Sequence, residues 1–141
     1  MYPPILDKKI EFAMNTEPIH LDMIQGDYKC GSLELVFPPA EMKLDKSMKL
    51  DKAWWTIKER MNDRKFVVQK TLGNGVEQVD ANDDRFIYTF ALYPEDTENL
   101  TPGEYVYDIR VKINDSKFTV MHGNMTILPS ITGKEAVINE Q

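Results

Sequence analysis

The stretch that decides the fold is residues 105–113, Tyr-Val-Tyr-Asp-Ile-Arg-Val-Lys-Ile. Its odd positions are all aromatic or aliphatic, while Asp108, Arg110 and Lys112 occupy even positions between them. A period of two is typical of a strand that has one face in the core and the other in water. The pattern predicts a half-buried strand with its charged side chains pointing outward.

The flanking segments extend this strand into a sheet. Residues 86–93 and 118–128 are rich in aromatic and β-branched side chains, which favour strands. The polar residues 114–117 are short enough to join two strands as a hairpin. Similar short strands and turn signals recur along the chain, and no helix-length amphipathic segment stands out. We therefore predict an all-β fold, an Ig-like or Greek-key β-sandwich of about seven to nine antiparallel strands.

Residues 100–105, Leu-Thr-Pro-Gly-Glu-Tyr, introduce the central strand. Pro102 presets the backbone for the second position of a turn, and Gly103 accepts the positive φ that a type II turn requires next. In Greek-key sandwiches, a tyrosine placed like Tyr105 turns its hydroxyl back onto the backbone just upstream. We predict such a tyrosine corner between two sheets; the alternative is an ordinary core tyrosine after an ordinary turn.

A chain of 141 residues is sufficient for one domain, which we place at residues 1–132. Residues 1–14 are either an N-terminal arm or an edge strand, and residues 133–141 are a polar C-terminal tail. Residues 42–52 contain two copies of Met-Lys-Leu-Asp-Lys, and they fit an extended segment and a short helical turn almost equally well.

The charge balance limits the classes of partner. The chain has 23 acidic and 17 basic residues and a formal net charge of −6. Nucleic-acid binding and adsorption to anionic lipid both require a basic surface, so we expect neither partner. We also find no apolar run long enough for a signal peptide or a membrane span, and we expect synthesis in a cytoplasm.

Candidate chemical sites are few. Cys30 is the single cysteine, so no internal disulfide forms, and we predict a buried structural thiol. His20 and Asp22 share one face of a predicted strand but fall short of the three or four ligands of a zinc site, and His122 reads as a packed or surface histidine. Residues 80–84 begin like a calcium loop without its later glycine and glutamate. We therefore predict no enzyme, no cofactor, no metal and no small-molecule substrate. The rival is a metal protein or enzyme built on His20, Asp22 and residues 80–84.

Trp54 and Trp55 are the most suggestive binding feature. Neighbouring strand residues point to opposite faces, so one sheet buries at most one of them. The other is covered by residues 42–52, lies in a protein interface, or forms a ligand site. Beside Tyr88 or Tyr93, an exposed tryptophan could form a platform for sugar rings.

The segment 100–109, Leu-Thr-Pro-Gly-Glu-Tyr-Val-Tyr-Asp-Ile, together with residues 122–132, resembles the N-terminal domain of baseplate upper proteins from phages of Gram-positive bacteria. Residues 25–27, Gln-Gly-Asp, and residues 55–58, Trp-Thr-Ile-Lys, are compatible with the same family. The chain departs from the family at its hairpin, where Asp115-Ser116 replaces Asp-Gly, and in the extra length of residues 42–52. Family members also usually continue into helical and receptor-linking regions.

This resemblance implies an Ig-like β-sandwich in a virion, where the chain is a non-catalytic structural or assembly component associated with the tail or baseplate. Its partners would be other phage structural proteins and further copies of itself. The residues that would maintain the motif are Leu100, Pro102, Gly103, Tyr105, Tyr107 and Asp108. Trp54 or Trp55 is the candidate contact. The alternative is a carbohydrate-binding module for cell-wall or receptor sugars.

Overall fold

The computed structural model describes residues 4–11, 17–36, 50–81, 85–113 and 116–131, which form nine strands and one short helix. In chain order these are β1 (Pro4–Glu11), β2 (Leu21–Ile24), β3 (Lys29–Val36), β4 (Leu50–Lys58), β5 (Val68–Leu72), β6 (Gly75–Ala81), β7 (Arg85–Leu92), α1 (Pro94–Thr97), β8 (Gly103–Ile113) and β9 (Ser116–Leu128). The all-β class expected from the sequence is confirmed.

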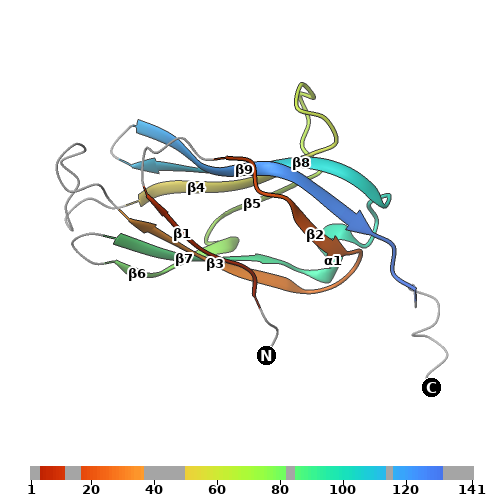
Figure 1. Cartoon of the computed structure of the whole chain (residues 1–141), viewed down its shortest axis with the longest axis horizontal. Helices are drawn as coiled ribbons and strands as arrows, with labels where there is room; N and C mark the ends of the chain where they lie inside the picture. Colours follow the sequence, from red (N-terminus) through yellow and green to blue (C-terminus); the bar gives the residue numbers. More distant parts are fainter. Residues whose placement is uncertain (1–3, 12–16, 37–49, 82–84, 114–115, 132–141) are drawn as a thin grey trace, which may run out of the picture.

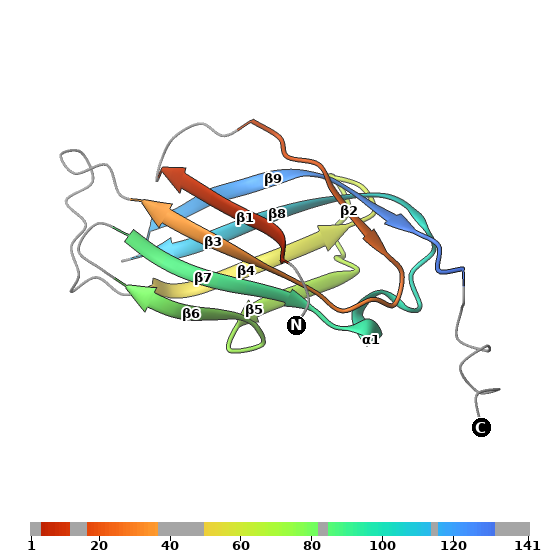
Figure 2. The same ribbon diagram turned by 60° about the horizontal axis from the view of Figure 1, so that its bottom comes forward.

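The strands belong to one mixed sheet in the order β1-β3-β7-β6-β5-β4-β8-β9-β2. Figure 1 shows this sheet folded into two layers, with β4, β8 and β9 in one and β3, β6 and β7 in the other. The hydrogen-bonded ladder continues from layer to layer through a short contact of β5 with β6. The sheet is therefore continuous and nearly closed on itself, with β1 and β2 at its two edges (Figure 2).

The expectation that all strands are antiparallel is wrong. β1 runs parallel to β3, β2 runs parallel to β9, and the β5–β6 contact is also parallel. Strands joined by a tight hairpin must be antiparallel, whereas extended parallel pairs such as β1–β3 and β2–β9 need longer connections. The β5–β6 contact covers only two residue pairs around the turn at Gly73 and Asn74. β1 reaches β3 only after the chain has passed through β2 at the opposite edge, so no hairpin dictates their direction.

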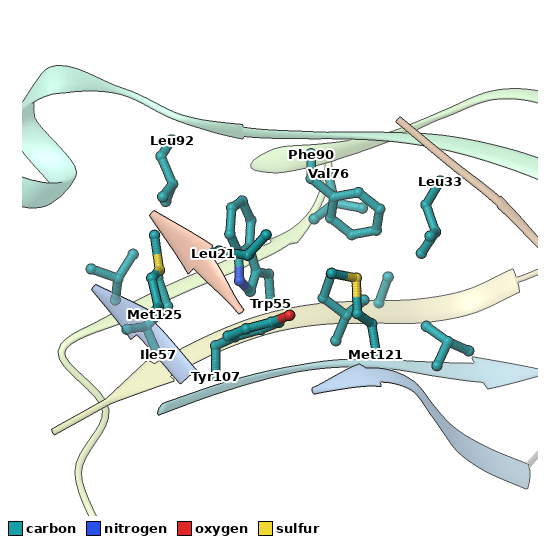
Figure 3. Packing of buried hydrophobic residues seen from close by; sticks show 14 of the residues in the cluster. Leu21, Leu33, Trp55, Ile57, Val76, Phe90, Leu92, Tyr107, Met121 and Met125 are labelled. Carbon is teal, nitrogen blue, oxygen red and sulfur yellow. The ribbon is translucent and has the colours of Figure 1, made fainter. Parts of the chain in front are cut away.

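The core lies between the two layers. The alternation predicted for residues 105–113 is present: Tyr105, Tyr107, Ile109 and Val111 are all buried. Trp55 is only 2% exposed and meets the ring of Phe90 edge-on, with centroids 6.1 Å apart. Methionines of β9 fill the space beneath them (Figure 3). β8 and β9 form the predicted hairpin, and Ile113 is paired with Ser116.

The helix α1 is tied to the body of the protein by a buried ion pair. Lys70 of β5 places its Nζ 3.1 Å from Oδ2 of Asp96, and both side chains are largely buried. The same ammonium lies 5.2 Å from the centre of the Tyr93 ring. Separating the two groups would leave a buried charge without its partner, which is costly. The ion pair therefore holds the β7–β8 connection against β5.

Two further sequence expectations differ from the structure. β6 was not predicted, because a register shift between Gln78 and Asp80 interrupts the period of two from which strands are recognised. Cys30 was expected to be buried, but it is half-buried, because it alternates with buried Gly31 and Leu33 and so lies on the face of β3 that points away from the core. Within residues 1–14, the described part is the edge strand β1. The repeat in residues 42–52 falls mostly outside the described residues.

Candidate functional site

The residues before β8 form a corner closed by Tyr105. Its hydroxyl donates to the carbonyl of Thr101 at 2.5 Å, the hydrogen bond expected of a tyrosine corner. The turn itself differs from the prediction. Gly103 has φ 151°, far from the value of about 80° in a type II turn, and it is the first residue of β8. The glycine therefore starts the strand rather than completing a turn, and exposed Pro102 precedes it.

A second contact joins this corner to a segment far away in the sequence. The side-chain amide of Gln25 donates to the carbonyls of Leu100 at 2.7 Å and Glu98 at 3.2 Å. The backbone amide of Gly26 donates to Oγ1 of Thr97 at 2.9 Å. The two Gln25 bonds give hydrogen-bond donors to carbonyl groups just after the short helix α1, where the helix supplies no further backbone amides. Two segments of the family resemblance, 25–27 and 100–109, are thus in direct contact.

Tyr107 anchors the chain just before β2. Its hydroxyl donates to the carbonyl of Ile19 at 2.6 Å, and the amide of Ile19 donates to the carbonyl of His122 at 2.9 Å. Gly123 is paired with Tyr107 across the β8–β9 ladder, and a Cβ atom on this glycine would lie 2.2 Å from the Ile19 oxygen. Close approach of the Ile19 backbone therefore requires a glycine here. The sequence alone did not reveal this contact.

The layer formed by β5, β4, β8, β9 and β2 has one side that points away from the core, which we call the outer face. Asp108, paired with His122 on one side and Thr56 on the other, projects to this side of β8. A cleft of about 670 Å³ opens here, lined by Pro18, Thr56, Lys58, Met61, Val106, Tyr107, Asp108, Thr119, His122, Gly123 and Asn124. Burial raises the pKa of the Asp108 carboxyl, and the nearby charges of Arg110, Lys58 and His122 oppose that rise.

One end of the cleft is the loop between β4 and β5. This loop exposes Met61 (78%) and Phe66 (51%), and Figure 1 shows it rising above the layer. Hydrogen bonds order it from within: Asp63 accepts from the amide of Arg60 at 3.2 Å, and Lys58 donates to the carbonyl of Asp63 at 2.8 Å. Contiguous exposed apolar surface marks contact sites, and this ordered loop exposes two large apolar side chains five residues apart.

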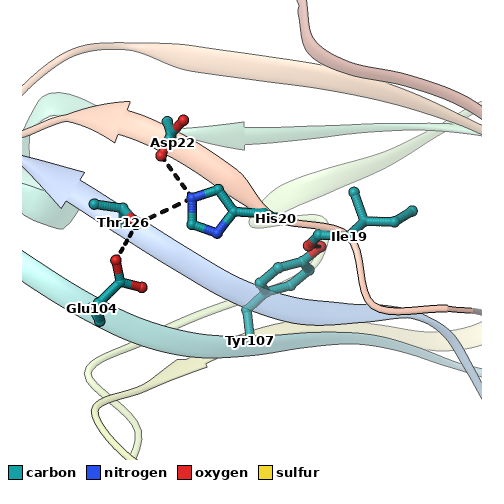
Figure 4. A network of polar contacts seen from close by, with 6 residues as sticks. All are labelled: Ile19, His20, Asp22, Glu104, Tyr107 and Thr126. Atoms are coloured by element: carbon teal, nitrogen blue, oxygen red, sulfur yellow. Dashed lines mark hydrogen bonds and ion pairs between the residues drawn. The ribbon is translucent and has the colours of Figure 1, made fainter.

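A polar network lies on the same face, where β8, β9 and β2 run side by side (Figure 4). His20 Nε2 lies 2.8 Å from Oδ1 of Asp22 and 3.1 Å from Oγ1 of Thr126. Thr126 in turn donates to Oε1 of Glu104 at 2.6 Å. The predicted pair of His20 and Asp22 does lie on one face, and it is engaged in hydrogen bonds across three strands.

The two tryptophans point to opposite faces, as predicted. Trp55 is in the core, and Trp54 is half-buried with the ammonium of Lys117 5.9 Å from its ring centre. Tyr88 is fully buried, so it forms no sugar platform with them. Tyr93 is partly exposed and lies beside Tyr28 with ring centroids 5.6 Å apart. One alternative was that residues 42–52 cover the outward tryptophan; of these, residues 42–49 lie outside the described part of the chain.

Among the described residues, no group of three or more histidine, cysteine, aspartate or glutamate side chains could hold a metal ion. Residues 82–84 of the predicted calcium-like loop lie outside this set. In the described parts of the chain, we find no helix with the length and hydropathy of a membrane span. No protein-family model matches the chain, and a search of curated proteins finds no significant match.

Proposed function

We propose that the chain is a non-catalytic structural component of a phage or prophage particle, associated with the tail or baseplate and acting through protein–protein contacts. The contact between residues 25–27 and residues 97–105 carries this proposal. Residues 25–27 and 100–105 belong to the family resemblance. The Gln25 amide donates to the carbonyl of Leu100, and the Tyr105 hydroxyl donates to the carbonyl of Thr101 in the same corner. A motif used in this way defines a fold rather than a reaction.

The finer architecture is part of the same proposal. We infer that the two layers are a variant of the Ig-like sandwich, in which the ladder is extended by the parallel edge strands β1 and β2. Tyr105 at the crossing from β7 to β8 supports this assignment, since the tyrosine corner is a feature of Greek-key sandwiches. The exposed apolar residues of the β4–β5 loop supply a surface for assembly.

The test is the composition of the particle. Particles are purified on a density gradient from the phage or induced lysogen that encodes the gene, and their proteins are identified by mass spectrometry. We expect this chain at a stoichiometry set by the tail symmetry, with antibody labelling at the tail end. Purified particles without the chain, from cells that express it, would contradict the proposal.

A carbohydrate-binding module is the alternative function. Its support is the pair of Tyr28 and Tyr93, because partly exposed aromatic rings stack on sugars. Titration of the purified chain with soluble cell-wall fragments, followed by tyrosine and tryptophan fluorescence, distinguishes the two. Saturable quenching that disappears in Tyr93→Ala would favour the sugar-binding module; an unchanged spectrum leaves the assembly role.

A further inference from the structure

Charge is distributed unevenly over the chain. Residues 58–66, here called the basic tip, contain four of the 17 basic and two of the 23 acidic side chains. The basic tip is therefore net +2, and the remainder of the chain is net −8. Arg60, Arg64 and Lys65 are all exposed there beside Met61 and Phe66. The tip thus combines positive charge with apolar contact area, a pairing that suits an acidic surface with apolar groups.

The outer face offers such a surface on the same molecule. Asp22, Ile24, Glu104 and Leu128, here called the acidic patch, lie where β2, β9 and β8 run side by side on this face. Ile24 and Leu128 are paired across β2 and β9, and they are 40% and 43% exposed. Both carboxylates are held in place by the network of His20 and Thr126 (Figure 4). Side chains ordered in advance lose less entropy when a partner binds.

The tip and the patch face the same way. Met61 lines the cleft together with Asp108 and His122, which project from the outer face. Alternate residues of a strand share a face, so along β9 His122 is on the same side as Leu128. When two copies are related by a two-fold axis, the tip of each copy can contact the patch of the other, so both contacts form in the same interface.

We propose that this chain forms a dimer in which the basic tip of each copy binds the acidic patch of the other. This inference deepens the assembly role proposed above by naming a second copy of the chain as the partner. The dimer is tested on the purified full chain. The chain could therefore prove monomeric and still be found in phage particles. Conversely, a dimer in solution does not depend on any phage.

The experiment uses complementary charge reversal. The tip variant carries Arg64→Glu and Lys65→Glu, and the patch variant carries Asp22→Lys and Glu104→Lys. Each variant alone brings like charges together at both contacts, whereas an equimolar mixture pairs opposite charges at both. Sedimentation velocity is measured from about 1 to 100 µM, because mass action governs dimerisation. Glu77→Lys, an exposed reversal on β6 in the other layer, is the matched control.

We expect a wild-type dimer, dimerisation weakened by roughly tenfold or more in each variant, and recovery in the mixture. The wild-type dimer should also weaken as salt is raised from about 0.1 to 1 M, where the screening length falls from about 10 Å to about 3 Å. The control should behave like the wild type. Thermal midpoints of all variants show that they remain folded, and Leu128→Asn provides a patch variant that leaves the His20 network intact.

Three results would overturn the proposal. The wild type could remain monomeric throughout the concentration range, its dimer could be insensitive to both reversals, or the mixture could fail to recover the dimer. A wild-type monomer that binds vesicles of anionic lipid through the basic tip would assign the tip to a membrane instead. Capture of the tip by a different particle protein, with no self-association, would assign it to a heterologous contact.

Discussion

Substitution of Gly123 by alanine tests the contact that anchors the chain ahead of β2. The new Cβ would lie 2.2 Å from the carbonyl oxygen of Ile19, so the Ile19 backbone must move by about 1 Å to reach an ordinary contact. That shift breaks the hydrogen bond from Tyr107 Oη at 2.6 Å and the bond from Ile19 N to His122 at 2.9 Å. Each hydrogen bond contributes about 0.5–1.5 kcal/mol, and a buried hydroxyl left without a partner costs about 1–3 kcal/mol. Loss of these two contacts should therefore lower the free energy of unfolding by about 2–4 kcal/mol, apart from the cost of the backbone conformation itself.

Gly103 provides the matched control. Its φ of 151° is close to the 157° of Gly123, but an added Cβ would meet nothing within 4 Å. Gly103→Ala therefore reports the cost of the backbone conformation alone, about 1–3 kcal/mol. The excess cost of Gly123→Ala over Gly103→Ala isolates the collision with Ile19. Urea unfolding followed by tryptophan fluorescence measures both, since Trp55 lies in the core.

A double-mutant cycle makes the reasoning refutable. Tyr107→Phe removes one of the bonds that Gly123→Ala is expected to break, so the two losses should not add. The double variant should be less destabilised than the sum of the single variants by about 1 kcal/mol. Strictly additive losses, or equal losses for Gly103→Ala and Gly123→Ala, would show that the Ile19 contact does not contribute as described.

Three further predictions concern stability. Tyr105→Phe should cost about 1 kcal/mol by removing the corner hydrogen bond, and an unchanged urea midpoint would count against the corner. Asp96→Asn should cost about 3 kcal/mol, because it leaves the buried Lys70 ammonium unpaired; Asp96→Asn combined with Lys70→Met should recover part of that loss in the same assay. Burial raises the pKa of Tyr88 and Tyr107, so the unfolded chain releases these protons first, and stability should fall as pH rises above about 10. Tyrosinate absorbance should show these two residues ionising only with unfolding, and their ionisation in the folded protein near pH 10 would contradict the prediction.

Sequence patterns located the hairpin of β8 and β9 because its signals are local. The period of two in residues 105–113 reports which side chains enter the core, and that information does not depend on the rest of the fold. The same reasoning explains why β6 was not predicted from the sequence: a register shift interrupts its alternation of inward and outward side chains. The opposite orientation of Trp54 and Trp55 was likewise predictable from strand geometry, whereas the half-burial of Trp54 was not.

The sequence alone therefore determined the all-β class, the face of β8 that enters the core, and the residues of the tyrosine corner, because each depends on neighbours along the chain. The tertiary structure decided the parallel edge strands, the binding of Gln25 to the corner and the need for glycine at position 123. It also decided that the basic tip and the acidic patch share one face. These features join residues far apart in sequence, and only the packed arrangement of the strands brings such residues within contact distance.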